Sequence, residues 1–219
     1  MLELNLSSVA LKRPLRMLCL GAHCDDIDIG CGGTLLQVLS PARRWDVTWV
    51  AFSAPPHRAG ELRKSARRFL RNAAQSQVVT HEFRDSFFPA QYSDIKEAFV
   101  SLRRLVDPDV IFTHYRHDLH QDHRIVSELT WNAFRRHLIL EYEIPKYDGG
   151  LSPTNVFVRL DKRHVEAKIR TLMSCYRSQL DKSWFTAETF RGIMRLRGIE
   201  SGGEGGWAEG FHAHKLCVG

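Results

Sequence analysis

The chain has 219 residues, of which 43% are hydrophobic and 26% are charged, and its formal net charge is +6. This composition is ordinary for a globular protein and excludes a largely disordered chain, and the length predicts a single domain over residues 1–219. Lys and Arg are dispersed and form no basic block, so an anionic small substrate or an acidic partner explains the positive charge as well as nucleic acid does, and we expect no nucleic-acid partner.

The cysteines and the N-terminal sequence predict the compartment. The five cysteines are odd in number and include no CxxC pair, which argues against a disulfide framework and favours a reducing cytoplasm. Residues 1–15 lack the apolar core of a signal peptide, and no apolar run approaches the roughly 18 residues of a membrane span. We therefore expect a cytoplasmic protein with no membrane span.

The first half of the chain alternates apolar runs with amphipathic stretches. Residues 16–22 and 46–52 have the apolar, β-branched and aromatic content of buried strands, and Thr34 to Leu39 falls in a helix between them. After a Pro-Pro turn, an apolar stripe that begins near Glu61 predicts a second helix. A third strand follows over residues 77–83.

The alternation continues in the second half. Ser93 is expected to be the N-cap of a helix that precedes a buried strand over residues 110–113. A further helix follows this strand. Two strands are then expected over residues 138–144 and 155–160, a helix over residues 161–175, and a glycine-rich stretch covers residues 198–210. Strands alternating with helices predict an α/β fold with a Rossmann-like, mostly parallel sheet and helices on both faces. The glycine-rich stretch is typical of a frayed tail or of a mobile loop over a site.

Two strand-to-helix turns carry the polar residues typical of chemistry. His23, Asp25 and Asp26 follow the first strand, and four histidines lie within residues 114–123, after the strand over residues 110–113. Ligands of open α/β sheets bind at the carboxyl ends of strands, although such residues can also simply cap a helix or line a strand end. Imidazole and carboxylate are the usual ligands of zinc, and a catalytic zinc takes three of them.

The two turns resemble the signatures of a known family. Residues 22–26 and 30–35 are similar to the AHPDDxxxGxGGTL motif of the PIG-L (LmbE-like) family of zinc-dependent N-acetylglucosamine deacetylases, and residues 117–123 are similar to its HDxHPDH motif. Cys24 and Gln121 stand where the family usually has proline, so both turns lose some rigidity. Neither change removes a residue that the motifs assign to the metal.

The resemblance implies a role for each motif residue. His23, Asp26 and His123 match the zinc ligands, and Asp25 matches the general base that takes a proton from the attacking water. The resemblance also implies that His120 donates to the oxyanion and that Asp122 orients an imidazole, which we expect to be that of His120. We therefore expect both to be catalytic residues.

The resemblance also suggests where a sugar binds. Arg63 and Asp85 look like the family's sugar-binding arginine and aspartate, and Arg67 and Arg68 compete with Arg63 for this role. Residues 208–211 are similar to a family segment of the form AExF, so the glycines just before them are expected to flank the site. The glycines of residues 30–33 are expected to give a metal and an acetamide clearance against the backbone.

The sequence thus predicts a zinc-dependent hydrolase that removes an N-acetyl or related acyl group from an amino-sugar-containing small molecule or glycosylated natural product. The same ligands accept other divalent metals, and a homo-oligomer is compatible with the sequence. Two alternatives stay open: a metal-dependent hydrolase of another amide or ester, and a non-catalytic Rossmann-like metal- or nucleotide-binding module. The glycines do not follow the GxGxxG spacing of dinucleotide-binding proteins.

Overall fold

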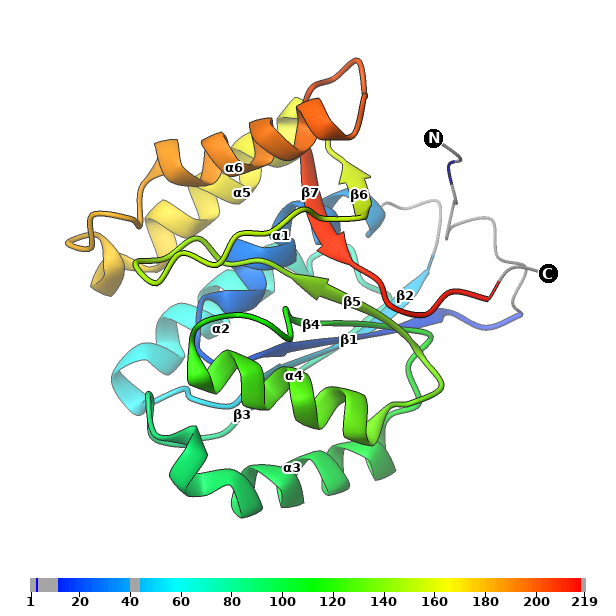
Figure 1. Ribbon diagram of the computed structural model, residues 1–219, viewed down its shortest axis with the longest axis vertical. Helices are drawn as coiled ribbons and strands as arrows, with labels where there is room; N and C mark the ends of the chain where they lie inside the picture. The colour runs from blue at the N-terminus through cyan, green and yellow to red at the C-terminus, as the bar shows by residue number, and fades with distance from the viewer. Residues whose placement is uncertain (1–2, 4–11, 40–43, 218–219) are drawn as a thin grey trace.

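A seven-stranded, mostly parallel sheet organises the part of the chain that the structure describes (Figure 1). This computed structural model describes residues 3, 12–39 and 44–217, so most of the N-terminal stretch considered for a signal peptide lies outside it. The strands are β1 (Leu15–Gly21), β2 (Trp45–Ala51), β3 (Gln75–Thr80), β4 (Val110–His114), β5 (Leu138–Tyr142), β6 (Val156–Arg159) and β7 (Ala208–His212). Their order is β3-β2-β1-β4-β5-β7-β6, and β7 alone runs in the opposite direction to the other strands. The predicted mostly parallel sheet is confirmed.

Helices cover both faces of the sheet, as predicted (Figure 1). One face carries α1 (Asp26–Val38), α2 (Pro56–Phe69), α5 (Lys162–Cys175) and α6 (Ala187–Glu200), and the other carries α3 (Tyr92–Leu105) and α4 (Gln121–Ala133). Two short 3-10 helices, η2 (Phe88–Gln91) and η3 (Arg177–Gln179), lie in the connections. Alternate residues of β1 enter two separate apolar cores, with Met17 and Cys19 in one and Leu18 and Leu20 in the other. None of the described helices is both long and apolar enough to cross a membrane.

Three local predictions differ from the structure. The third helix begins at Tyr92, so Ser93 lies inside it and Gln91 occupies the N-cap position. The glycine-rich stretch is not a tail, because it contains the end of α6 and the start of β7, which inserts between β5 and β6. The loop between α6 and β7 packs on arginines, with Arg195 Nη1 donating to the Gly206 carbonyl at 2.8 Å, and it is absent from the lining of the pocket described below. The expectation that it flanks the site is wrong.

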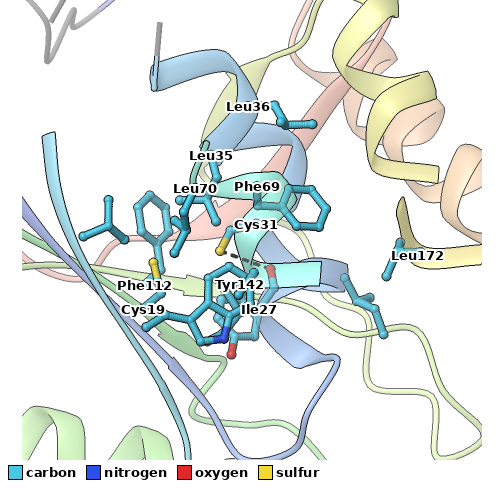
Figure 2. Close-up of a cluster of buried hydrophobic side chains, with 14 of the residues drawn as sticks. Cys19, Ile27, Cys31, Leu35, Leu36, Phe69, Leu70, Phe112, Tyr142 and Leu172 are labelled. Carbon is cyan, nitrogen blue, oxygen red and sulfur yellow. Dashed lines mark hydrogen bonds between the residues drawn. The ribbon is translucent and has the colours of Figure 1, made fainter. Parts of the chain in front are cut away.

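The glycines of α1 allow core side chains to approach the helix, as the close packing around Cys31 in Figure 2 illustrates. A Cβ atom on Gly30 would overlap the Tyr142 ring, and one on Gly32 would come within 2.8 Å of Phe69 Cε1. Gly33 faces the Glu209 carboxylate, whose Oε1 would lie 2.9 Å from an added Cβ. The expectation that these glycines make room for a metal and an acetamide is therefore wrong: the space is taken by packed side chains.

Replacing Gly30 with Ala is expected to lower the free energy of unfolding by about 1–3 kcal/mol, the usual cost of overpacking a core. The Tyr142 ring cannot simply move away, because its hydroxyl donates to the Leu20 carbonyl at 2.6 Å. Gly60→Ala in α2 is the matched control: an added Cβ there meets nothing within 4 Å, and we expect a gain of about 0.5–1 kcal/mol. Urea denaturation measures both. Equal changes in the two variants would contradict this account of Gly30.

A buried ion pair joins α1, α5 and β7. Lys168 Nζ lies 2.6 Å from Glu209 Oε1, and the two side chains are 1% and 4% exposed. The Glu209 carboxylate also accepts the backbone N–H groups of Gly33 at 2.8 Å and Thr34 at 2.6 Å, and Lys168 Nζ donates to the Ile29 carbonyl. Each charge therefore has hydrogen bonds in addition to its partner, which is the condition under which a buried pair is tolerated.

Removing one partner leaves a buried charge unpaired, so Lys168→Met is expected to cost about 3–5 kcal/mol of stability. The control is Arg163→Met, which breaks an exposed 3.0 Å pair with Asp161 and is expected to cost at most about 1 kcal/mol. Urea denaturation again gives both values. A small and equal loss in the two variants would show that the buried pair does not hold the three elements together.

Candidate active site

The turns that follow β1 and β4 meet because these strands are neighbours in the sheet. Asp25 occupies the N-cap position of α1, but its side chain makes no capping hydrogen bond and stays available for other contacts. His120 is the N-cap of α4, and its ring nitrogen Nδ1 accepts the backbone N–H of Asp122 at 3.2 Å. Both helices therefore begin at the carboxyl edge of the sheet and aim their first residues at one place.

Three of the residues brought together here point electron-rich atoms at one another. His23 Nδ1 lies 3.3 Å from Asp26 Oδ2 and 3.3 Å from His123 Nε2, and Asp26 Oδ1 lies 3.6 Å from His123 Nε2. The rings are only 11% and 3% exposed, and the Asp26 side chain is 5% exposed. A buried cluster of this kind needs a positive charge at its centre, either a proton or a metal ion.

The opposite edges of the two imidazole rings are held by carboxylates. His23 Nε2 lies 3.1 Å from Asp85 Oδ1 and 3.2 Å from Asp122 Oδ2, while His123 Nδ1 lies 3.0 Å from Asp118 Oδ2. Each outer nitrogen thus donates its N–H to a carboxylate, and each inner nitrogen keeps a lone pair directed at the cluster. Histidines that bind metals in proteins are usually oriented in this way.

The protonation states agree with a cation site. Burial lowers the pKa of His123 to about 3, with a further contribution from His114, so its ring is neutral. Burial opposes ionisation of Asp26, but the surrounding histidines outweigh it and hold the pKa of Asp26 well below its ordinary value. Burial also lowers the pKa of His23, yet Asp26 and Asp122 more than compensate and raise it well above its ordinary value. Without a metal, His23 would carry the neutralising proton.

The separations within the cluster suit a metal ion. Two ligands at about 2.0–2.2 Å from one zinc ion lie roughly 3.3–3.5 Å apart. His23 Nδ1 and His123 Nε2 are 3.3 Å apart, and Asp26 lies 3.3 Å from the first through Oδ2 and 3.6 Å from the second through Oδ1. His114 also reaches Asp26, at 3.1 Å, but its Nε2 already accepts the backbone N–H of Ala22 at 2.9 Å and has no free lone pair to offer. His23 and His123 form one possible metal-holding group with His120, and Asp26 and His123 form another with His114, so His123 links the two groups. Imidazole and carboxylate ligands of this kind suit several divalent ions.

Asp25 lies beside the cluster and pairs with an arginine that the sequence analysis missed. Arg58 Nη2, from the first turn of α2, lies 3.1 Å from Asp25 Oδ1, and both side chains are largely buried at the pocket wall. Arg58 follows the carboxyl end of β2, so the same strand-end rule that singled out His23 applies to it. That position was its only signal in the sequence.

His120 is arranged as a hydrogen-bond donor. Its Nδ1 accepts the N–H of Asp122, so in the neutral ring the proton sits on Nε2. Burial, followed by the neighbouring His23, lowers the pKa of His120 and keeps the ring neutral. The ring lines the pocket, with its centroid 5.0 Å from that of His23.

Asp122 orients a different imidazole from the expected one. Its fully buried carboxylate contacts His23 and accepts the backbone N–H groups of Ser86 at 2.7 Å and Phe88 at 3.2 Å. Its backbone N–H, and not its carboxylate, contacts His120. Ser86 has a φ of 65°, in the left-handed region that non-glycine residues rarely adopt, and this conformation directs its N–H at Asp122. The carboxylate that holds His123 is that of Asp118, a residue for which no role was predicted.

The two predicted sugar-binding residues lie in different places. Asp85 is at the pocket rim, with its side chain 58% exposed and one oxygen on His23. Donation from His23 is the main cause that holds the pKa of Asp85 below its ordinary value. Arg63 is exposed on α2, donates to Thr80 Oγ1 at 3.4 Å, and is not among the residues that line the pocket. The structure therefore brings Asp85, but not Arg63, to the other site residues.

The inner wall of a pocket of about 310 Å³ is formed by the cluster and the side chains beside it: His23, Asp25, Asp26, Arg58, Asp85, Ser86, His120 and His123. Its outer wall comes from two segments that follow β5 and η3 and includes Lys146, Tyr147, Lys182 and Trp184. Tyr147 Oη lies 3.2 Å from Ser183 Oγ, which connects the two segments across the pocket. The volume is at the lower end of the range of about 300–1,000 Å³ found for small-molecule sites.

The family model described as PIG-L, GlcNAc-PI de-N-acetylase, matches residues 18–134, a span that contains both turns. The chain belongs to the PIG-L family. No curated protein matches its sequence. The PIG-L match ends with α4, so β5, β6, β7 and the outer wall of the pocket lie beyond it.

Solved structures share the fold over nearly the whole chain. The conserved protein TT1542 of Thermus thermophilus is 21% identical, with a TM-score of 0.72 over 93% of this chain and 96% of that chain. The N,N'-diacetylchitobiose deacetylase of Pyrococcus horikoshii is 19% identical, with a TM-score of 0.67 over 95% and 88%. GalB, the 4-carboxy-2-hydroxymuconate hydratase of Pseudomonas putida KT2440, is 15% identical, with a TM-score of 0.72 over 94% and 98%. At such identities the likeness shows a common fold and leaves the reaction to be argued from the site.

Proposed function

We propose that this PIG-L protein is a zinc-dependent hydrolase that removes an N-acetyl or related acyl group from an amino-sugar-containing small molecule or glycosylated natural product. The observation that carries the proposal is the convergence of His23, Asp26 and His123 beside a fourth residue, Asp25. The Asp25 carboxylate takes no part in the short contacts among the three and is paired with Arg58 instead. The family model and the chitobiose deacetylase support the choice of an N-acetylated amino sugar.

The residues divide the work of amide hydrolysis. A bound divalent cation would lower the pKa of water and polarise the amide carbonyl. Asp25 takes the proton of the attacking water and returns it to the departing amine. The Nε2–H of His120 donates to the oxyanion of the tetrahedral intermediate, where charge develops during the reaction. Asp118 and Asp122 keep the two ligand histidines in the orientation that leaves their inner nitrogens free.

A deacetylation assay on a panel of amides tests this function. The panel holds N-acetylglucosamine glycosides, N,N'-diacetylchitobiose, nucleotide sugars and acylated glycopeptides, with released primary amine and acetate both measured. We expect equal amounts of the two products from at least one amino-sugar substrate, and loss of both after chelation. Activity that survives chelation would exclude the metal mechanism. Hydration of a carbon–carbon double bond, the reaction class of GalB, would release neither product.

Arg58, and not Arg63, is expected to contact the substrate. Arg58→Gln should raise KM by about tenfold or more, because a charge-assisted hydrogen bond in a pocket contributes about 1.5–3 kcal/mol. Arg63→Gln removes the same charge from the same helix at an exposed position and should leave KM within about twofold. Steady-state kinetics on the best substrate of the panel measure both. An increase in KM for Arg63→Gln alone would restore the sugar-binding role that the family resemblance implies for Arg63.

A further inference from the structure

A second cavity lies at the opposite end of α4 from the candidate active site. It encloses about 870 Å³, against about 310 Å³ for the pocket at His23. The 13 residues of α4, about 20 Å of helix, separate the two. The walls of this cavity carry six basic side chains, which we call the basic groove: Lys96, Arg103, Arg104, Arg135, Arg136 and His137.

The charges of the basic groove are not neutralised by the described residues around it. No described carboxylate lines the cavity, and none of its four arginines forms an ion pair with a described residue. Lys96 Nζ donates to Asn132 at 2.8 Å, and His137 alone pairs with an acid, Asp107, at 3.3 Å. Elsewhere in the molecule Arg116 and Arg197 bind buried glutamates directly. Arg135 Nε donates to the Asn132 carbonyl at 3.2 Å, and the remaining guanidinium donors of the groove are available to a ligand.

Helix electrostatics account for only part of this arrangement. Arg103 and Arg104 lie in the last turn of α3, where positive charge favours the helix dipole. Arg135 and Arg136 lie beyond the end of α4 and yet line the same cavity. Compensating two separate helix dipoles does not require four guanidinium groups around one concave surface. An anion bound between the two segments would account for this arrangement.

We propose that the basic groove binds a small molecule that carries two or more phosphate groups. Arginine binds phosphate through two parallel hydrogen bonds, so two consecutive arginine pairs on separate segments match at least two phosphates. The described lining contains two aromatic rings: Phe99, which is fully buried, and His137, whose side chain is 21% exposed and is paired with Asp107. The lining therefore offers little aromatic surface on which a nucleobase could stack. The volume is that of a small-molecule site, which favours a compact polyanion over an extended nucleic acid or a flat membrane.

Isothermal titration of the purified protein with inorganic pyrophosphate and tripolyphosphate, at about 0.15 M salt, tests the proposal. We expect saturable binding of one ligand per chain, with orthophosphate at least about tenfold weaker. Arg104→Gln/Arg135→Gln should weaken pyrophosphate binding by about tenfold or more. The control Arg67→Gln/Arg71→Gln removes the same charge from exposed positions outside the groove and should stay within about twofold.

Several results would overturn the proposal. Pyrophosphate that does not bind, or that binds no more tightly than orthophosphate, would do so. Equal weakening of pyrophosphate binding in the two double variants would show a general effect of net charge. Pyrophosphate binding that is unchanged in Arg104→Gln/Arg135→Gln would place the ligand elsewhere, for example at the metal cluster. Binding of a single-stranded oligonucleotide or of phosphatidylserine vesicles, without pyrophosphate binding, would assign the groove to a macromolecular surface instead. Because all four substituted arginines are exposed, circular dichroism should show both double variants folded.

Discussion

Asp25→Asn is expected to lower kcat by about 10²–10⁴-fold while the protein keeps its full metal content. The amide has nearly the same size as the carboxylate but cannot accept the proton of the attacking water. Asp25 makes none of the short contacts that join His23, Asp26 and His123, so its loss should leave the metal ligands in place. Turnover with the best substrate and metal analysis of the same preparation measure the two effects.

The ion pair between Asp25 and Arg58 supplies the control for this experiment. Arg58→Gln breaks the same 3.1 Å contact but leaves the carboxylate in place. If the effect of Asp25→Asn came from the lost pair, both variants would lose kcat equally. We expect Asp25→Asn to reduce kcat and Arg58→Gln to act mainly on KM. Full turnover in Asp25→Asn would exclude Asp25 as the base.

The strands and helices that the sequence predicts have mostly apolar buried faces, and α5 is among them although it buries Lys168, because apolar residues make up most of the rest of its buried stripe. α6 and β7 escaped prediction, and in each of them a charged residue takes one of only a few buried positions. Arg197 of α6 is 4% exposed and binds Glu143 through Nε and Nη2, at 2.6 Å each, so an arginine occupies a place where the helical pattern calls for an apolar residue. Glu209 of β7 is buried against Lys168 and α1. Alternation of apolar and polar residues cannot reveal a strand whose polar residue is internal.

The site shows the same division between local and tertiary information. Within each turn the site residues are close together in sequence, so each motif could be recognised directly. The convergence of the two turns followed from the expected arrangement of the strands. Arg58 comes from a third element, and its place beside Asp25 depends on how α2 packs. Arg63 is five residues further along that helix, about 140° around its axis, and therefore faces away from the pocket. The sequence likewise did not show which carboxylate holds which imidazole. Asp118 and Asp122 lie in the same motif, and only the folded chain shows that Asp122 contacts His23 and that Asp118 contacts His123.

Removal of a metal ligand is expected to have the largest effect of any substitution. His123→Ala and Asp26→Ala should each lose the bound metal and all measurable turnover. Either change removes one of the three donors that can hold the ion, and a catalytic zinc site has only three from the protein. Asp118→Asn should have a smaller effect, about 10–100-fold weaker metal binding, because it leaves His123 in place but weakens the group that orients it. Metal content after dialysis and competition with a zinc-binding dye give the order of the effects.

The matched control is His117→Ala. His117 belongs to the same motif, but its side chain is exposed and its ring packs 5.4 Å from that of Tyr115, outside the cluster. We expect this variant to keep one metal per chain and wild-type turnover. A histidine-rich turn that bound metal through any available imidazole would lose affinity in His117→Ala as well. Loss of metal confined to variants of His23, Asp26 and His123 would instead require the fixed geometry in which a carboxylate holds each ligand imidazole on its outer edge. That geometry is what distinguishes the ligand histidines from His117.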